Sequence, residues 1–289
     1  MEHLSNIKMI FVDLDGTLVQ GVNIITPRTI RVFERIREMG IIPVIATGRP
    51  LYETDFACQA IGANGYLITM NGLEIYENYR MGKLLYEAYM PEDTAEYIMD
   101  FLFKENVFFQ TYAGGRSHCQ KDKMCLIGDS GIEREYLDYF VNMTKWVENL
   151  WPYLKENSLR INKFFVCIAD RGKRERVRKE LEGISGIRTL SSGENYVEVV
   201  PEGTDKRRAV KRVKDAEGLT NEQVMVIGDS ENDLGMFDEA CTCVAMGNAC
   251  PQLKAKANYI APANDEEGVA CILERLLLTE KDLHQQLQG

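Results

Sequence analysis

The sequence is poor in proline and lacks any long apolar run. It has 8 prolines and 23 glycines in 289 residues, with 45% apolar and 27% charged residues. This composition excludes collagen-like, low-complexity and disordered chains. No apolar run approaches the length of a membrane span, and residues 1–11 lack the basic start and apolar core of a signal peptide. We therefore expect a cytoplasmic protein, and the length favours two domains of roughly 150 residues each.

Positive charge is also in deficit. The chain carries 34 Lys and Arg residues against 44 Asp and Glu residues, which gives a net charge of −10. A field of this sign repels polyanions, so we expect neither nucleic acid nor an anionic membrane as a partner. The charge leaves open whether the protein is a monomer or a homo-oligomer.

The cysteines lack the spacing of a metal site. There are 8, scattered along the chain. Neither the Cys241 and Cys243 pair nor the group of His118, Cys119 and Cys125 has a second CxxC or a His-x-His partner. We therefore expect no zinc site, and we expect free thiols in a reducing compartment.

Short apolar runs alternate with helical patterns at both ends of the chain, which is typical of a parallel sheet with helices on its faces. One helix begins at Thr26 and Pro27 and ends near Gly40. The sequence therefore predicts an α/β fold, with a Rossmann-like, doubly wound parallel-sheet core formed by residues 1–84 and 193–289. The predicted core strands are 9–12, 41–46, 66–69, 224–227 and 241–245, and the further helices are 50–61, 206–217 and one after Asn232.

The pattern changes between residues 85 and 192. Aromatic-rich strands are predicted at 107–112 and 162–169, and a charged helix is predicted at 171–181. We interpret this stretch as an inserted αβ domain.

Polar side chains follow four predicted core strands at the point where each strand ends. In an open α/β sheet this edge is where ligands bind. Clustered carboxylates there require a cation, and oxygen ligands without His or Cys favour Mg²⁺. A calcium loop is excluded, because its twelfth position would be Ile24 instead of Glu. The side chains are Asp13 and Asp15, Thr47 with Gly48 and Arg49, Asn71, and Asp229 with Asn232 and Asp233.

The spacing of Asp13 and Asp15 suits phosphoryl transfer. One carboxylate can attack phosphorus to form an aspartyl-phosphate, and the other can give a proton to the leaving group. The Thr47 hydroxyl and neighbouring backbone N–H groups can hold phosphate oxygens. Lys206, which opens a predicted helix, can supply the positive charge that phosphoryl transfer needs.

These motifs, in their order and spacing, resemble those of the haloacid dehalogenase superfamily, in its Cof-type class IIB phosphatases. The resemblance covers nearly the whole chain and implies that residues 85–192 form the family's αβ cap. It departs at one point, because the usual Lys-Gly of the third motif is Lys206-Arg207 here. The motifs are Asp13-Leu-Asp15-Gly-Thr, Thr47-Gly-Arg49, Lys206, Gly228-Asp-x-x-Asn-Asp233 and the later Ala245-Met-Gly-Asn248.

The resemblance implies a role for each matching residue. Asp13 would be the nucleophile and Asp15 the general acid and base. Mg²⁺ would be held by Asp13, Asp229 and the main-chain carbonyl of Asp15. The phosphate would be bound by Thr47, Gly48, Lys206 and Asn232, with Asp233 and Asn71 in support.

The expected function is therefore that of a Mg²⁺-dependent phosphatase acting on a small phosphorylated metabolite, such as a sugar phosphate. A phosphomutase and a non-catalytic regulator that binds phosphate esters remain as alternatives. The inserted domain is expected to recognise the leaving group. A predicted loop from Tyr112 to Lys123, with Arg116 and His118, supplies candidate contacts.

Overall fold

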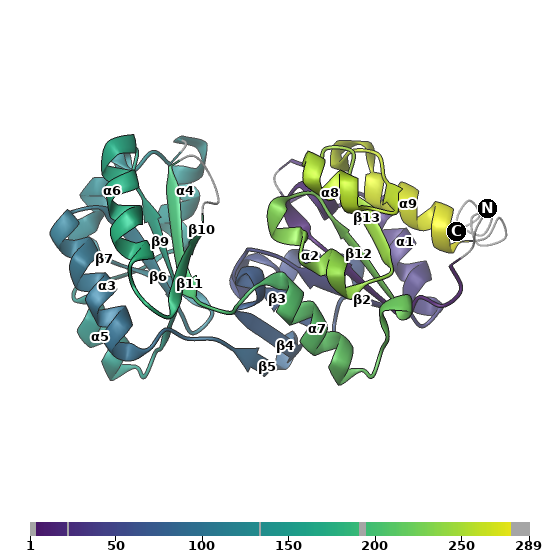
Figure 1. The fold of residues 1–289 in the computed structure, drawn as a ribbon, viewed down its shortest axis with the longest axis horizontal. Coiled ribbons are helices and arrows are strands. Elements are labelled where there is room, and N and C mark those ends of the chain that lie inside the picture. The colour runs from purple at the N-terminus through teal and green to yellow at the C-terminus, as the bar shows by residue number, and fades with distance from the viewer. Residues whose placement is uncertain (1–3, 22, 133, 191–194, 279–289) are drawn as a thin grey trace. The chain divides into compact units, whose positions relative to one another are not determined.

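The computed structural model describes residues 4–21, 23–132, 134–190 and 195–278. The chain forms two compact units, one made of residues 1–87 and 205–289 and the other of residues 88–204 (Figure 1). Within the described ranges, none of the helices has the length and apolar character needed to cross a membrane. All eight cysteines lie in these ranges and are free thiols, as expected.

The first unit is built on an eight-stranded sheet. Its six strands from β14 to β3 are parallel, and β4 and β5 extend the sheet antiparallel. The central strand β1 is wholly buried, which accounts for its uninterrupted apolar sequence. In spatial order the strands are β14 (Tyr259–Ile260), β13 (Thr242–Ala245), β12 (Val224–Gly228), β1 (Met9–Val12), β2 (Ile42–Ala46), β3 (Leu67–Thr69), β4 (Glu74–Asn78) and β5 (Lys83–Glu87).

Helices cover both faces of this sheet, with α7 in front of it and α1 behind it in Figure 1. The predicted start of α1 is confirmed, because the Thr26 hydroxyl accepts a hydrogen bond from the Thr29 N–H at 3.2 Å and Pro27 occupies the first turn. Gly40 follows the helix with a φ of +78°, as its predicted place requires. The helices of the unit are α1 (Pro27–Glu38), α2 (Asp55–Ile61), α7 (Lys206–Ala216), α8 (Pro251–Lys256) and α9 (Gly268–Leu277).

The helix predicted after Asn232 is wrong. The segment forms only two short 3₁₀ turns, Glu231–Asp233 and Met236–Glu239. Gly235 separates them at a point where the backbone passes close to α7, since a Cβ atom there would lie 2.8 Å from the Cβ of Arg207. The segment is therefore shaped by its contact with α7, which helical periodicity does not reveal.

The second unit has a six-stranded sheet covered by helices that share one apolar core. Strand β11 pairs antiparallel with β9, so the border expected after residue 192 would separate β11 from its own sheet. In spatial order the strands are β10 (Ile187–Leu190), β11 (Tyr196–Pro201), β9 (Ile161–Cys167), β6 (Phe108–Ala113), β7 (Arg116–Gln120) and β8 (Lys145–Val147). The helices are α3 (Glu92–Glu105), α4 (Arg134–Met143), α5 (Leu150–Glu156) and α6 (Arg171–Glu182).

The loop predicted from Tyr112 to Lys123 is also wrong. The chain turns at Gly114 and Gly115, whose φ angles are +58° and +71°, and then returns as β7. His118 lies inside this strand and is 3% exposed. Burial and the nearby charge of Lys145 lower the pKa of its imidazole to about 4, so His118 is a neutral core side chain instead of a surface contact.

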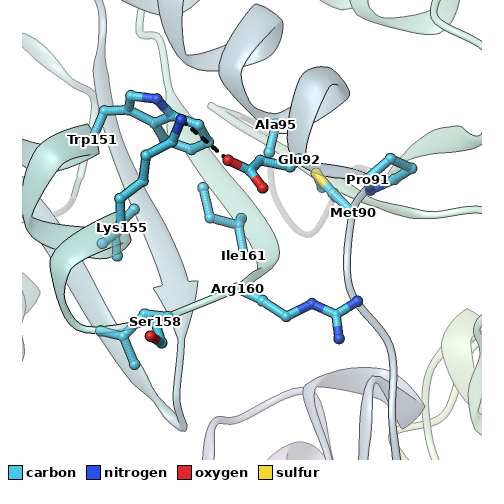
Figure 2. A pocket seen from close by; sticks show the side chains of 11 residues that line it. Met90, Pro91, Glu92, Ala95, Trp151, Lys155, Ser158, Arg160 and Ile161 are labelled. Atoms are coloured by element: carbon cyan, nitrogen blue, oxygen red, sulfur yellow. Dashed lines mark ion pairs between the residues drawn. The ribbon is translucent and has the colours of Figure 1, made fainter.

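A cavity of about 580 Å³ lies within the second unit. Figure 2 shows it between the start of α3, helix α5 and the segment that leads into β9. Its interior is mainly apolar, and an ion pair of 3.1 Å joins Lys155 to Glu92 beside it. None of its lining residues belongs to the motifs identified in the sequence. They are Met90, Pro91, Glu92, Ala95, Trp151, Leu154, Lys155, Ser158, Leu159, Arg160 and Ile161.

We expect acid to destabilise the folded protein through His118. Its folded pKa of about 4 lies below the ordinary value of 6.5, so between these values the unfolded chain binds a proton that the folded chain does not. The stability that depends on the neutral ring is present above pH 6.5 and is lost as the pH falls toward 4. Between pH 7 and pH 5, the wild-type protein should lose about 2 kcal/mol of unfolding free energy relative to His118→Gln. Urea unfolding measures this difference, and equal pH slopes for the two proteins would contradict it.

Candidate active site

The carboxyl ends of four neighbouring parallel strands position the candidate residues. Asp13 directly follows β1, and its backbone N–H donates to the Ile227 carbonyl of β12 at 3.0 Å. Thr47 follows β2, and its N–H donates to Ile68 of β3 at 2.9 Å. Asn71 follows β3, and its N–H donates to the Thr47 carbonyl at 2.9 Å. The ladder therefore continues past the strand ends and fixes these residues along one edge of the sheet.

Lys206 brings a positive charge to this edge from the first turn of α7. Its side chain is fully buried, and its Nζ donates to Asp13 Oδ1 at 2.6 Å and to Asp233 Oδ1 at 2.7 Å. Burial alone lowers the pKa of Lys206, but the charges of Asp13 and Asp233 outweigh burial and raise it. The group is therefore an ammonium ion held between two carboxylates.

Asp13 is 4% exposed. Burial, followed by the charge of Asp233, raises the pKa of its carboxyl well above the ordinary value, while Lys206 acts in the opposite direction. Asp13 is thus a carboxylate in an environment where more positive charge would be strongly favourable.

Asp229 follows β12 and approaches the turn after β1. The Thr17 hydroxyl donates to its Oδ1 at 2.7 Å, and burial raises the pKa of its carboxyl to about 6. Gly16 makes this approach possible, because a Cβ atom at position 16 would lie 2.5 Å from Asp229 Oδ2 and the residue has a φ of +75°. Glycine is therefore required both for the turn and for the closeness of Asp229.

Asp233 anchors the segment that carries Asp229. One oxygen accepts from Lys206, and the other accepts from the backbone N–H groups of Asp229 at 3.0 Å and Ser230 at 3.1 Å. Because both oxygens already have donors, Asp233 is well suited to orient the turn and its neighbours.

Three carboxylates at this edge can hold a metal ion. In the described part of the chain, Asp13, Asp229 and Asp233 each offer an oxygen, and these oxygens lie within 4.8 Å of one another. The raised pKa values of Asp13 and Asp229 and the all-oxygen donor set fit a hard cation such as Mg²⁺. Asp233 is a side chain of this acidic group to which the resemblance gave only a supporting role, and the metal role of the Asp15 main-chain carbonyl stays a prediction.

The Asp15 side chain contacts Arg49, a pairing that the sequence did not predict. The Arg49 guanidinium donates to both of its carboxylate oxygens, from Nε at 2.8 Å and from Nη2 at 2.5 Å. Arg49 also donates to Asn23 Oδ1 at 2.7 Å. The sequence did indicate Arg49, because it follows Thr47 and Gly48 directly after a predicted strand. Nothing in the sequence indicated Asn23.

The remaining polar residues form hydrogen bonds along the same edge of the sheet. Asn232 donates to Asn71 Oδ1 at 3.0 Å, and Asn248 donates to the Gly16 carbonyl at 2.8 Å. Thr47 is fully buried, and its Oγ1 accepts from the Arg49 N–H at 3.1 Å, which leaves the hydroxyl hydrogen for another acceptor. The structure therefore brings all the predicted site residues of the first unit to one edge.

Known proteins match most of this chain in sequence and in structure. Residues 10–273 match the family described as haloacid dehalogenase-like hydrolase. A 5-amino-6-(5-phospho-D-ribitylamino)uracil phosphatase, YwtE of Bacillus subtilis, is 28% identical, covering 93% of this chain and 98% of the relative. The pyridoxal phosphate phosphatase YbhA of Escherichia coli is 25% identical, with 91% and 96% covered. A crystal structure of a haloacid dehalogenase-like hydrolase from Bacteroides thetaiotaomicron has a TM-score of 0.80 at 31% identity, with 93% and 99% covered.

We expect Lys206→Met to destabilise the protein strongly at neutral pH. The substitution leaves Asp13 and Asp233 buried beside each other without a counter-charge, which should cost about 3–5 kcal/mol of unfolding free energy. Lys211→Met is the matched control, because Lys211 lies in the same helix, is exposed and pairs with Asp215; its change should stay within about 0.5 kcal/mol. Urea unfolding at pH 7 measures both free energies. A loss in Lys206→Met as small as that in Lys211→Met would show that the folded state does not require the buried ammonium.

Proposed function

The chain belongs to the haloacid dehalogenase-like hydrolase family and is a phosphoric monoester hydrolase, and we propose that it hydrolyses a small phosphorylated metabolite with Mg²⁺ through a phosphoryl group carried by Asp13. The observation that carries this proposal is the contact of 2.6 Å between the buried Lys206 ammonium and Asp13 Oδ1. A carboxylate oriented in this way at the carboxyl end of a central strand is suited to nucleophilic attack.

The proposed reaction has two displacements. Asp13 Oδ2 forms a bond to phosphorus while the bond to the ester oxygen breaks, and Asp15 gives a proton to the leaving alcohol. A water molecule then attacks the phosphorus, its proton passes to Asp15, and the bond to Asp13 breaks. Inorganic phosphate is released, and both aspartates return to their starting states.

Several groups at the strand ends would hold the transferred phosphate. The Thr47 hydroxyl, the Gly48 N–H, Asn232 and the Lys206 ammonium are the proposed donors, and Asn71 supports Asn232 through their hydrogen bond of 3.0 Å. These donors act on the charge that spreads over the phosphate oxygens in the transition state.

Asp13, Asp229 and the main-chain carbonyl of Asp15 would hold Mg²⁺. When bound, the ion supplies positive charge that lets an anionic ester approach two carboxylates. Asp233 would act by orienting the turn that carries Asp229.

The relatives support a small phosphorylated metabolite as the substrate, since two of them are named as phosphatases of metabolites that carry a heterocyclic ring. We assign leaving-group recognition to the second unit, residues 88–204, as the family's αβ cap, because the residues around Asp13 address only phosphate and metal. A screen of sugar phosphates and phosphorylated heterocycles for released phosphate tests this substrate class. In the same screen, dependence on a bisphosphate activator would reveal a phosphomutase.

We expect Asp13→Asn to abolish turnover without unfolding the protein. A neutral amide is a far weaker nucleophile than a carboxylate, so kcat should fall by at least about 1,000-fold. Asp215→Asn, at an exposed position in α7, should leave kcat unchanged. Release of phosphate and circular dichroism of both variants measure the effect, and near-normal kcat in Asp13→Asn would refute the assignment.

We expect metal removal to stop hydrolysis and added Mg²⁺ to restore it, since Asp13 and Asp229 otherwise repel the substrate phosphate. A second measurement does not depend on activity. Mg²⁺ should raise the melting temperature of the wild-type protein, and the increase should be smaller in Asp229→Asn. Full activity in excess chelator, or equal thermal shifts in the two proteins, would contradict this site.

A further inference from the structure

The contact between Arg49 and Asp15 carries an inference that goes beyond the roles that the family resemblance implies. We propose that Arg49 is a positioning residue that holds the Asp15 carboxyl group in the orientation needed for proton transfer to the leaving group. The inference rests on the proposed function, because it assumes that Asp15 serves the leaving group.

The geometry of the contact is that of a two-point clamp. Arg49 Nε and Nη2 reach the two different oxygens of Asp15, at 2.8 and 2.5 Å. A planar guanidinium that donates in parallel to both oxygens fixes the orientation of the carboxylate plane, which a single hydrogen bond does not do.

The two partners differ in exposure. The Asp15 side chain is 56% exposed, whereas that of Arg49 is 18% exposed. An exposed aspartate is otherwise free to sample several rotamers, so its orientation here depends on the less exposed arginine.

Arg49 is itself held on several sides. Its N–H donates to Thr47 Oγ1 at 3.1 Å, and its carbonyl accepts from the Met70 N–H at 2.9 Å. Its guanidinium lies 5.8 Å from the Phe56 ring centroid and donates to Asn23 at 2.7 Å. The clamp is therefore built on the ends of β2 and β3, beside the residue proposed to bind phosphate.

The chemical consequence concerns esters with poor leaving groups. Proton transfer to the leaving oxygen requires the Asp15 carboxyl group to be aimed at that oxygen, and the two-point contact with Arg49 fixes this orientation. A carboxylate has about four lone-pair sites, and the two donors of Arg49 leave room for the proton that Asp15 must exchange. Alkyl esters need this proton transfer more than aryl esters do, because an alcohol is a weaker acid than a phenol.

The Asp15 side chain is 56% exposed, and ion pairs to such a group contribute little to folding, so Arg49→Gln should remain folded. With Mg²⁺ present, its kcat on benzyl phosphate should fall roughly 10- to 100-fold with little change in KM, and its kcat on p-nitrophenyl phosphate should fall much less. The two esters have rings of similar size and differ mainly in the acidity of the leaving group. Arg178→Gln, which removes an exposed ion pair in α6, is the matched control and should leave both rates unchanged.

Two further variants separate positioning from other roles. In an Asp15→Ala background, Arg49→Gln should cause almost no additional loss, because Arg49 acts through Asp15. Arg49→Lys keeps the charge but lacks the two-point geometry, so it should restore little of the rate on benzyl phosphate.

Other results would overturn the inference. Additive losses in the double variant, equal losses on both esters, or a change confined to KM would mean that Arg49 contacts the substrate phosphate instead. Full activity in Arg49→Lys would mean that charge alone suffices. These outcomes are distinct from failure of the proposed function, which would appear as a wild-type protein that hydrolyses neither ester.

Discussion

The buried ammonium of Lys206 is the interaction on which the rest of the site depends. It lies 2.6 Å from Asp13 and 2.7 Å from Asp233, and without it two buried carboxylates would lie beside each other with no counter-charge. The carboxylates in turn raise the pKa of the lysine and keep it charged. Lys206 opens α7, Asp13 follows β1 and Asp233 lies in the turn after β12, so the pairing of opposite charges at one point joins segments from both ends of the chain.

The carboxylates of Asp13 and Asp229 are what suits this site to phosphate chemistry. Both oxygens of Asp233 already accept hydrogen bonds, whereas Asp13 and Asp229 are carboxylates that burial makes costly to charge. A cation and an anionic ester together complement such a pair better than either alone. The approach of Asp229 is possible only because residue 16 has no side chain. The turn after β1 therefore positions both Asp13 and Asp229.

Much of the site could be predicted from the sequence because parallel strands place their carboxyl ends on one edge. The apolar runs before Asp13, Thr47 and Asp229 are easy to recognise, and each is followed at once by polar residues. The clamp of Arg49 on Asp15 could not be predicted, because a long side chain has many possible partners and its choice depends on folded geometry. The pairing of β11 with β9 and the burial of His118 in β7 likewise depend on contacts between segments that no local pattern encodes.

The central claim is that phosphate passes through Asp13 before it reaches water. The stereochemical course at phosphorus tests it directly, with a phosphorothioate ester made chiral by oxygen isotopes and hydrolysed in isotopically labelled water. Two successive displacements, at Asp13 and then by water, predict overall retention of configuration. Overall inversion would mean that water attacks the substrate directly, and it would contradict the account.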